Sequence, residues 1–198
     1  SGNHIWDKKE GVELLDRVPN LLRPANYPEV NLGKGLYVGE TAAGIPVAVM
    51  NLEGRVFMNS LESPFVTADR LLASLDPKVK VVFVDFHAEA TSEKQALGFY
   101  LDGRVSAVVG THTHVPTADE RILPQGTAFQ TDVGMTGPYE SIIGVRVDKI
   151  IKRFLYQTPV SFEVAKHDVR LAGTLIDIDE TTGKASKIER LLIPDSSA

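Results

Sequence analysis

The pattern of apolar and polar positions along the chain predicts a layered α/β fold. Residues 79–86 and 105–109 are nearly continuous β-branched or aromatic runs, which are typical of strands buried on both faces of a parallel sheet. Apolar residues at helical spacing alternate with such runs. We predict helices at residues 7–15, 67–75, 92–100 and 147–156, and strands at residues 35–38, 46–51, 79–86, 105–109, 127–132, 160–164, 169–178 and 187–193.

The segments between these elements carry ordinary loop signals. Residues 18–28 are dense in proline, so we expect them to run extended over the surface. Asp7 is a plausible first-turn or capping residue, and residues 179–183 form a turn between the last two strands. Since the chain contains no internal repeat or linker, we expect residues 1–198 to form one domain.

Composition narrows the possible functions. The 198 residues are 43% hydrophobic and 24% charged, which is ordinary for a globular domain. The net charge is −5 without a basic stripe, so binding to duplex nucleic acid is disfavoured. There is no cysteine, and any metal must therefore be held by nitrogen and oxygen ligands. No apolar run long enough to span a bilayer and no leader is evident, so we expect a cytoplasmic protein without membrane contact.

Three histidines follow predicted buried strands. His87 ends the run at residues 79–86, while His112 and His114 come directly after the run at residues 105–109 and Gly110. Ligands of open α/β sheets bind beyond the carboxyl ends of the strands. On extended backbone, residues two apart point to one side, so both imidazoles of the pair can face one point. A metal site with zinc, manganese, iron or nickel is one interpretation; histidines satisfied by hydrogen bonds at strand ends are the alternative.

The first residues add two further candidates. Asn3 and His4 follow Gly2, which permits a tight turn close to a ligand. An amide oxygen such as that of Asn3 can ligate a divalent cation, while the adjacent imidazole can donate a proton.

Taken together, these motifs resemble a known family. Gly-Asn-His, a histidine at a strand end and Gly-x-His-x-His stand in the order of the later motifs of the calcineurin-like metallophosphoesterases. The resemblance extends to the YmdB-type branch of bacterial cyclic-nucleotide phosphodiesterases, over essentially the whole chain. It is strongest at residues 2–10, 23–26, 86–94, 108–115 and 131–138. The implied fold is an α-β-β-α metallophosphoesterase sandwich, here without its first strands and helices.

The resemblance also implies roles for individual residues. Asn3, His87 and His112 would bind one metal ion, His114 would bind the other, and His4 would protonate the leaving oxygen. The cofactors would be two divalent ions, iron or manganese before zinc or magnesium. Substrates would be small phosphodiesters such as 2′,3′- or 3′,5′-cyclic nucleotides, cleaved by a metal-activated hydroxide. A homo-oligomer is also implied.

Other polar residues are candidates for supporting roles. Arg23 could meet a phosphate through its planar guanidinium, Asn26 could contact a base or ribose, and Asp132 opens a loop that could line the pocket. Plain loop or turn contacts explain these three residues equally well. Asp85 and Glu89 flank His87 and could orient its ring.

Members of this branch carry an Asp ligand and a metal-bridging Glu before the Gly-Asn-His motif, and neither lies within residues 1–198. We therefore expect this polypeptide to bind metal weakly and to show little hydrolysis unless a preceding segment or a second chain completes the centre. Two alternatives to the phosphodiesterase remain. One is a catalytically incomplete metal- or nucleotide-binding module, and the other is a phosphomonoesterase or nuclease of the same superfamily.

Overall fold

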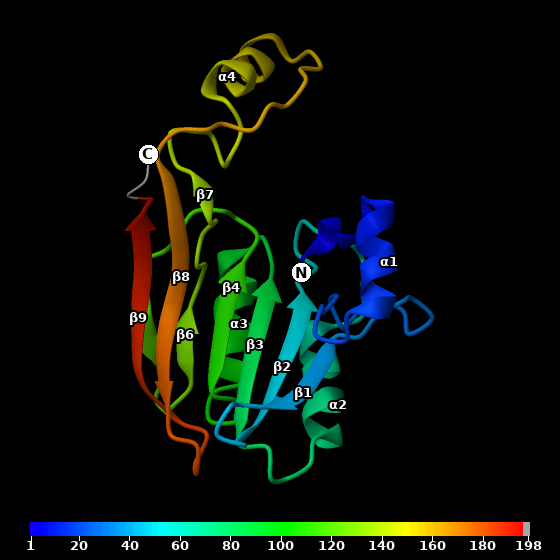
Figure 1. Cartoon of the computed structure of the whole chain (residues 1–198), viewed down its shortest axis with the longest axis vertical. Helices are drawn as coiled ribbons and strands as arrows, with labels where there is room; N and C mark the ends of the chain where they lie inside the picture. The colour runs from blue at the N-terminus through cyan, green and yellow to red at the C-terminus, as the bar shows by residue number, and fades with distance from the viewer. Residues whose placement is uncertain (196–198) are drawn as a thin grey trace.

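The main sheet organises the molecule. In this computed structural model, which describes residues 1–195, six strands lie in the order β1-β2-β3-β4-β6-β5 (Figure 1). The central strands β2, β3, β4 and β6 run parallel, and the edge strands β1 and β5 pair antiparallel with their neighbours. The strands are β1 (Leu36–Glu40), β2 (Pro46–Glu53), β3 (Val81–His87), β4 (Ala107–Thr111), β5 (Arg121–Ile122) and β6 (Ala128–Gln130).

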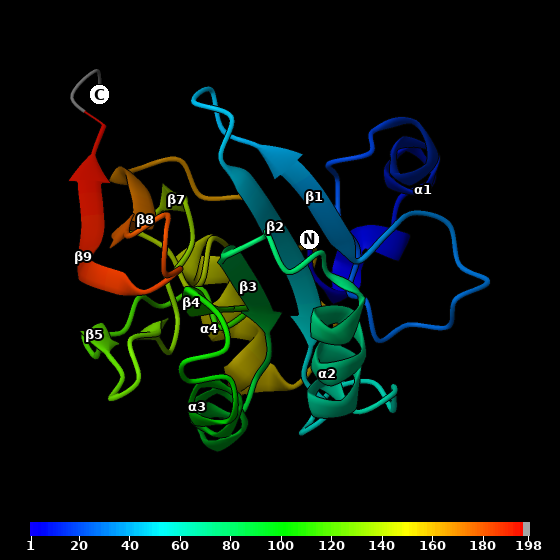
Figure 2. The ribbon, with the colours of Figure 1, turned by 90° about the horizontal axis from the view of Figure 1, so that it is seen from below.

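Two helices cover one face of this sheet (Figure 2). They are α2 (Pro64–Ser74) and α3 (Thr91–Tyr100), and both agree with the predicted segments to within a few residues. The fully buried side chains of β2 and β3, such as Met50, Leu52 and Phe86, pack in one core cluster with Leu97 of α3. Burial of these large apolar side chains is the main stabilising contribution to the fold.

The opposite face of the sheet is only partly covered. Along β3, Val82, Val84 and Phe86 are buried, whereas Phe83 and its neighbours two residues apart are half-buried. The prediction that this strand is buried on both faces was therefore wrong for one face. That face borders an apolar groove of about 340 Å³, which Val49, Phe83, Val109, Val133 and Gly173 line in part.

A second, three-stranded sheet packs against part of that face. It consists of β7 (Gly137–Pro138), β8 (Val169–Ile178) and β9 (Ala185–Pro194) in sequence order. Ala107, Val109, Ala128 and Ala185 form a separate buried cluster between the two sheets. The predicted turn between β8 and β9 is confirmed, since Asp179 accepts hydrogen bonds from Thr181 and Thr182. Helix, sheet and sheet layers confirm the predicted layered α/β class.

The remaining segments lie around the ends of the strands. A short 3₁₀ helix η1 (Asn3–Trp6) precedes α1 (Lys9–Arg17), while α4 (Val147–Tyr156) lies in a lobe that projects from the body (Figure 1). The strand predicted at residues 160–164 is wrong, because this segment forms only an isolated bridge between Val145 and Val164. Within residues 1–195, no helix is long and apolar enough to cross a membrane.

The proline-rich segment at residues 18–28 also differs from its prediction. Leu22, Arg23, Pro24 and Asn26 are buried, so the segment does not run over the surface. Ala25 N donates to the carbonyl of Asn51 in β2, at 2.8 Å, which fixes the segment to the edge of the sheet. Polar groups inside the protein therefore accept the hydrogen bonds of the buried backbone N–H groups of this loop.

Candidate metal centre

The candidate centre lies at the carboxyl ends of the parallel strands. Glu53 at the end of β2 is in register with His87 at the end of β3, and His87 is in register with Thr111 at the end of β4. His112 follows directly. Parallel pairing therefore brings residues from three separate sequence segments to one edge, as the strand positions predicted.

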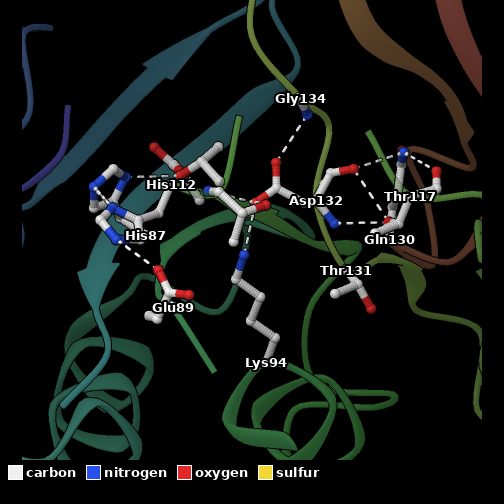
Figure 3. Close-up of polar contacts among 12 residues, drawn as sticks. His87, Glu89, Lys94, His112, Thr117, Gln130, Thr131, Asp132 and Gly134 are labelled. Atoms are coloured by element: carbon white, nitrogen blue, oxygen red, sulfur yellow. Dashed lines mark hydrogen bonds and ion pairs between the residues drawn. The ribbon is translucent and has the colours of Figure 1, made fainter. Parts of the chain in front are cut away.

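Three potential ligand atoms converge there. His87 Nε2 lies 2.9 Å from Asn3 Oδ1 and 3.0 Å from His112 Nδ1. The two imidazole centroids are 4.7 Å apart with the rings at 75°, and Figure 3 shows the two rings side by side. Asn3 comes from η1, His87 from β3 and His112 from the loop after β4, so the cluster depends on the tertiary fold.

Hydrogen-bond partners define the tautomers of both imidazoles. Thr111 Oγ1 donates its only proton to Asp85 Oδ1 at 2.9 Å. The same hydroxyl oxygen must therefore accept from His87 Nδ1, which lies 3.1 Å away. His112 Nε2 lies 3.1 Å from a carboxylate oxygen of Glu89 and donates to it. Each ring thus carries its proton on the nitrogen turned away from the cluster. The lone pair of His87 Nε2 therefore faces both the carbonyl oxygen of Asn3 and Nδ1 of His112.

Electrostatics keep both rings neutral. Burial, with smaller contributions from His112, the chain's amino terminus and Lys94, lowers the pKa of His87 to about 3. Burial also lowers the pKa of His112, although Glu89 opposes this effect. Neutral imidazole is the form that binds a metal ion.

The geometry and chemistry of these three groups fit a divalent cation. The two separations from His87 Nε2, 2.9 Å to Asn3 Oδ1 and 3.0 Å to His112 Nδ1, are short enough for these atoms to share one ion. Without a cation, three acceptors would face one another at hydrogen-bonding distance with no proton between them. Among residues 1–195, no group of three or more His, Cys, Asp or Glu side chains is placed to hold a metal, so the amide of Asn3 is essential to the cluster.

Two glycines make the convergence possible. A Cβ on Gly2 would overlap the imidazole of His87, and a Cβ on Gly110 would overlap the backbone carbonyl of Thr131. Both positions therefore require a residue without a side chain. This explains physically why glycine precedes Asn3 and why glycine lies near the end of β4, two residues before His112.

The other two predicted histidines lie outside the cluster. We expected His112 and His114 to share an extended strand and to point to one side. Instead, their φ angles are 104° and 68°, because the strand ends at Thr111 and the chain turns. His114 is exposed, and its Nδ1 lies 3.0 Å from the carbonyl oxygen of Ile143. His4 is also exposed, with its Nδ1 2.8 Å from Asp7 Oδ2.

The three residues predicted to contact substrate are buried. Arg23 donates to the backbone carbonyls of Pro24, Leu32 and Asn31. Asn26 donates to the carbonyls of Glu53 and Glu62 and accepts from Glu53 N, at 2.9 Å. Asp132 forms an ion pair with Lys94. Their polar atoms hold loops in place, which is the plain alternative to substrate contact.

Sequence reasoning missed several residues around the cluster. Glu89 was paired with His87, but it contacts His112. Thr111, which links His87 to Asp85, was not considered. Lys94 is buried, and a signal for this existed: it lies three residues before the buried Leu97 on the same face of α3.

The fold and the cluster together define a layered α/β protein with two imidazoles and an amide gathered at the carboxyl ends of parallel strands. The chain belongs to the YmdB-like protein family, whose model matches residues 1–191. It is 59% identical over 195 residues to a Bacillus subtilis protein named 2′,3′-cyclic-nucleotide 2′-phosphodiesterase, and the alignment covers 98% of this chain and 73% of that relative. That relative is by its name a phosphoric diester hydrolase.

Solved structures agree with this assignment. A hypothetical protein from Thermus thermophilus superposes with a TM-score of 0.91 and 45% identity, over 98% of this chain and 75% of that one. A crystal structure of a novel phosphatase from Mycoplasma pneumoniae gives a TM-score of 0.87 and 36% identity, over 99% of this chain and 72% of that one. The mixed α/β fold is therefore shared with known members.

Proposed function

We propose that this protein is a divalent-metal phosphodiesterase that hydrolyses small cyclic nucleotides, either 2′,3′- or 3′,5′-cyclic monophosphates, with residues 1–198 acting as a single domain. The observation that carries the proposal is the convergence of Asn3 Oδ1, His87 Nε2 and His112 Nδ1, in which His87 Nε2 lies within 3.0 Å of each of the other two atoms. The activity in the name of the Bacillus subtilis relative supports the substrate class.

The residues of the cluster would each have a defined part. Asn3, His87 and His112 would bind one ion, and His114 would bind the second after its ring leaves the carbonyl of Ile143. Two divalent ions, iron or manganese before zinc or magnesium, would supply a hydroxide nucleophile and neutralise the phosphoryl oxygens. Glu89 orients the ring of His112 through its carboxylate, since outer partners of this kind fix the tautomer of a ligating imidazole.

His4 would act as the general acid. Asp7 accepts from His4 Nδ1 at 2.8 Å, which fixes the ring and leaves Nε2 available to the substrate. The side chain of His4 is 78% exposed, so a leaving oxygen can reach it without any displacement of the core. In its doubly protonated form, His4 would donate the Nε2 proton to the leaving alkoxide as the ester bond breaks, and would remain as neutral imidazole with its Nδ1 proton still donated to Asp7.

Hydrolysis measured with manganese or ferrous iron tests this proposal. The substrates are 2′,3′-cyclic AMP, 3′,5′-cyclic AMP, bis-p-nitrophenyl phosphate and p-nitrophenyl phosphate. Where a preceding segment or a second chain completes the centre, we expect cleavage of diesters, at least about tenfold slower in His87→Ala and His112→Ala. The matched control is His167→Ala, which removes an exposed histidine outside the cluster. Cleavage of only the monoester, or equal rates in all variants, would contradict the proposal.

A second candidate is a catalytically incomplete metal-binding module. It is favoured because, within residues 1–195, no set of three or more His, Asp or Glu side chains gathers at one point. Elemental analysis after dialysis separates the two functions. About two manganese ions per chain would indicate a completed dinuclear centre. One ion or none, with no hydrolysis of any substrate, would indicate the module.

A further inference from the structure

A buried ion pair lies directly beneath the candidate metal centre. Lys94 Nζ of α3 is 2.7 Å from Asp132 Oδ2 in the loop after β6, and both side chains are only 1% exposed (Figure 3). Removing two charges from water is costly, and such a pair is weak evidence for stability by itself. The contacts of its two members indicate what the pair does instead.

The carboxylate of Asp132 accepts hydrogen bonds from the loop that carries the histidines. Its Oδ2 accepts from Thr113 N at 3.1 Å and from Thr113 Oγ1 at 2.8 Å. Its Oδ1 accepts from Gly134 N at 2.8 Å. Thr113 lies between His112 and His114, so the carboxylate holds the residue that separates the two histidines of the Gly-Thr-His-Thr-His motif.

The backbone at this point needs such an anchor. His112 and His114 have φ angles of 104° and 68°, a region that residues other than glycine rarely adopt. A strained conformation persists only where the surroundings fix it. The hydrogen bonds from Thr113 to Asp132 fix the residue between the two strained ones. They thereby hold the turn that aims His112 Nδ1 at His87.

Lys94 has space in the core because of Gly110. A Cβ at Gly110 would lie 3.1 Å from Lys94 Cδ, so the glycine of the same motif makes room for the lysine stem. The ammonium group supplies the charge that a buried carboxylate needs. Since α3 packs against the main sheet, the lysine connects the histidine loop to the rigid part of the fold.

We propose that the Lys94–Asp132 pair is a positioning device that fixes Thr113 and thereby sets the direction of His112 toward the metal ion. The inference rests on the proposed metal centre but assigns residues that do not touch the ion. Other contacts of Asp132 use its backbone, since its carbonyl accepts from Gln130 Nε2 and its N–H donates to Thr117 Oγ1. These two backbone contacts remain when the side chain is substituted, and Asp132→Asn keeps a side-chain oxygen that can accept from Gly134 N.

The test measures the affinity for Mn²⁺ by isothermal titration calorimetry, well below the Tm of each variant. Thr113→Val removes the hydroxyl but leaves no buried charge, and Thr113→Ser restores the hydroxyl. The double variant Lys94→Met with Asp132→Asn removes both charges together. We expect affinity to fall severalfold in Thr113→Val and about tenfold in the double variant, and to recover in Thr113→Ser.

A neighbouring carboxylate provides the matched control. Asp119 accepts from Thr131 N at 3.1 Å and from Thr131 Oγ1, so it fixes the residue next to Asp132 in the same way, but it is not a partner of Thr113. Asp119→Asn should lower Tm without changing the affinity for Mn²⁺. This separates a general loss of stability from a loss of positioning.

The outcomes distinguish the inference from the proposed function. Affinity equal to the wild-type value in both Thr113→Val and the double variant would overturn the positioning role while leaving the metal centre intact. A wild-type protein that binds no Mn²⁺ would overturn the metal centre and the inference with it. If the double variant does not fold, the comparison of Thr113→Val with Thr113→Ser decides.

Discussion

Gly2→Ala is the most direct perturbation of the candidate centre, because the new methyl group would meet His87 itself. The three nearest atoms all belong to the imidazole ring, and the farthest of them, Nδ1, would lie only 2.7 Å from the added carbon. Ordinary contact begins at 3.4 Å and the nearest ring atom, Cε1, would lie at 2.2 Å, so the ring or η1 must move by about 1.2 Å. Ligand constellations tolerate displacements of only about 0.5 Å.

We therefore expect Gly2→Ala to weaken Mn²⁺ binding by about 10- to 100-fold, a range typical of lost ligand orientation. Because η1 is a short surface element, the global free energy of unfolding should fall by no more than about 1–3 kcal/mol. Calorimetric titration gives the first quantity and urea denaturation the second. Gly137→Ala is the control, since a Cβ there meets nothing within 4 Å. Unchanged affinity in Gly2→Ala would refute the convergence of Asn3 and His87 on one ion.

Three further predictions concern residues around the site. Asn26→Ala removes the side chain that bonds the carbonyls of Glu53 and Glu62 and the N–H of Glu53, so urea denaturation should show a free energy of unfolding lower by about 3 kcal/mol. A changed KM at unchanged stability would instead indicate substrate contact. Phe57 is 90% exposed at a φ of 62°, so Phe57→Gly should stabilise the fold by about 1 kcal/mol in the same assay, and a loss of stability would contradict this. Burial raises the pKa of the Glu53 carboxyl above its ordinary value of 4.5. The stability that this carboxyl contributes is therefore greatest below its pKa in the unfolded chain, and it is lost as the pH rises through its pKa in the folded protein. Glu53→Gln should therefore raise Tm at neutral pH more than at acidic pH in thermal melts, and an equal change at both pH values would contradict the buried carboxyl.

Strand positions could be predicted from the sequence because the relevant signal is local. The apolar run before His87 places that histidine at the end of β3, and parallel pairing then brings it beside Thr111 and His112. Periodicity could not provide the conformation of the histidine pair. Whether His112 continues the strand depends on Thr113 bonding to Asp132, and that partner is 19 residues away in sequence.

The roles of conspicuous polar residues were harder to predict. Arg23 and Asn26 lie in segments that match the family, but a matching segment does not tell whether its polar groups serve the fold or the substrate. The structure resolves this for their hydrogen bonds, because both side chains are buried against backbone carbonyls. Sequence spacing contains no information about such distant partners.

A balance of donors and acceptors explains why some polar groups suit a ligand and others do not. The buried amide of Asn26 finds internal partners on both its oxygen and its nitrogen. At the strand tips, by contrast, three acceptors face one another without a donor. In the proposed function, a cation would provide the missing positive partner there. Glu53 can be neutralised by a proton rather than by a cation, since its fully buried Oε2 has no hydrogen-bond partner. Burial raises the pKa of this carboxyl, which favours the protonated form.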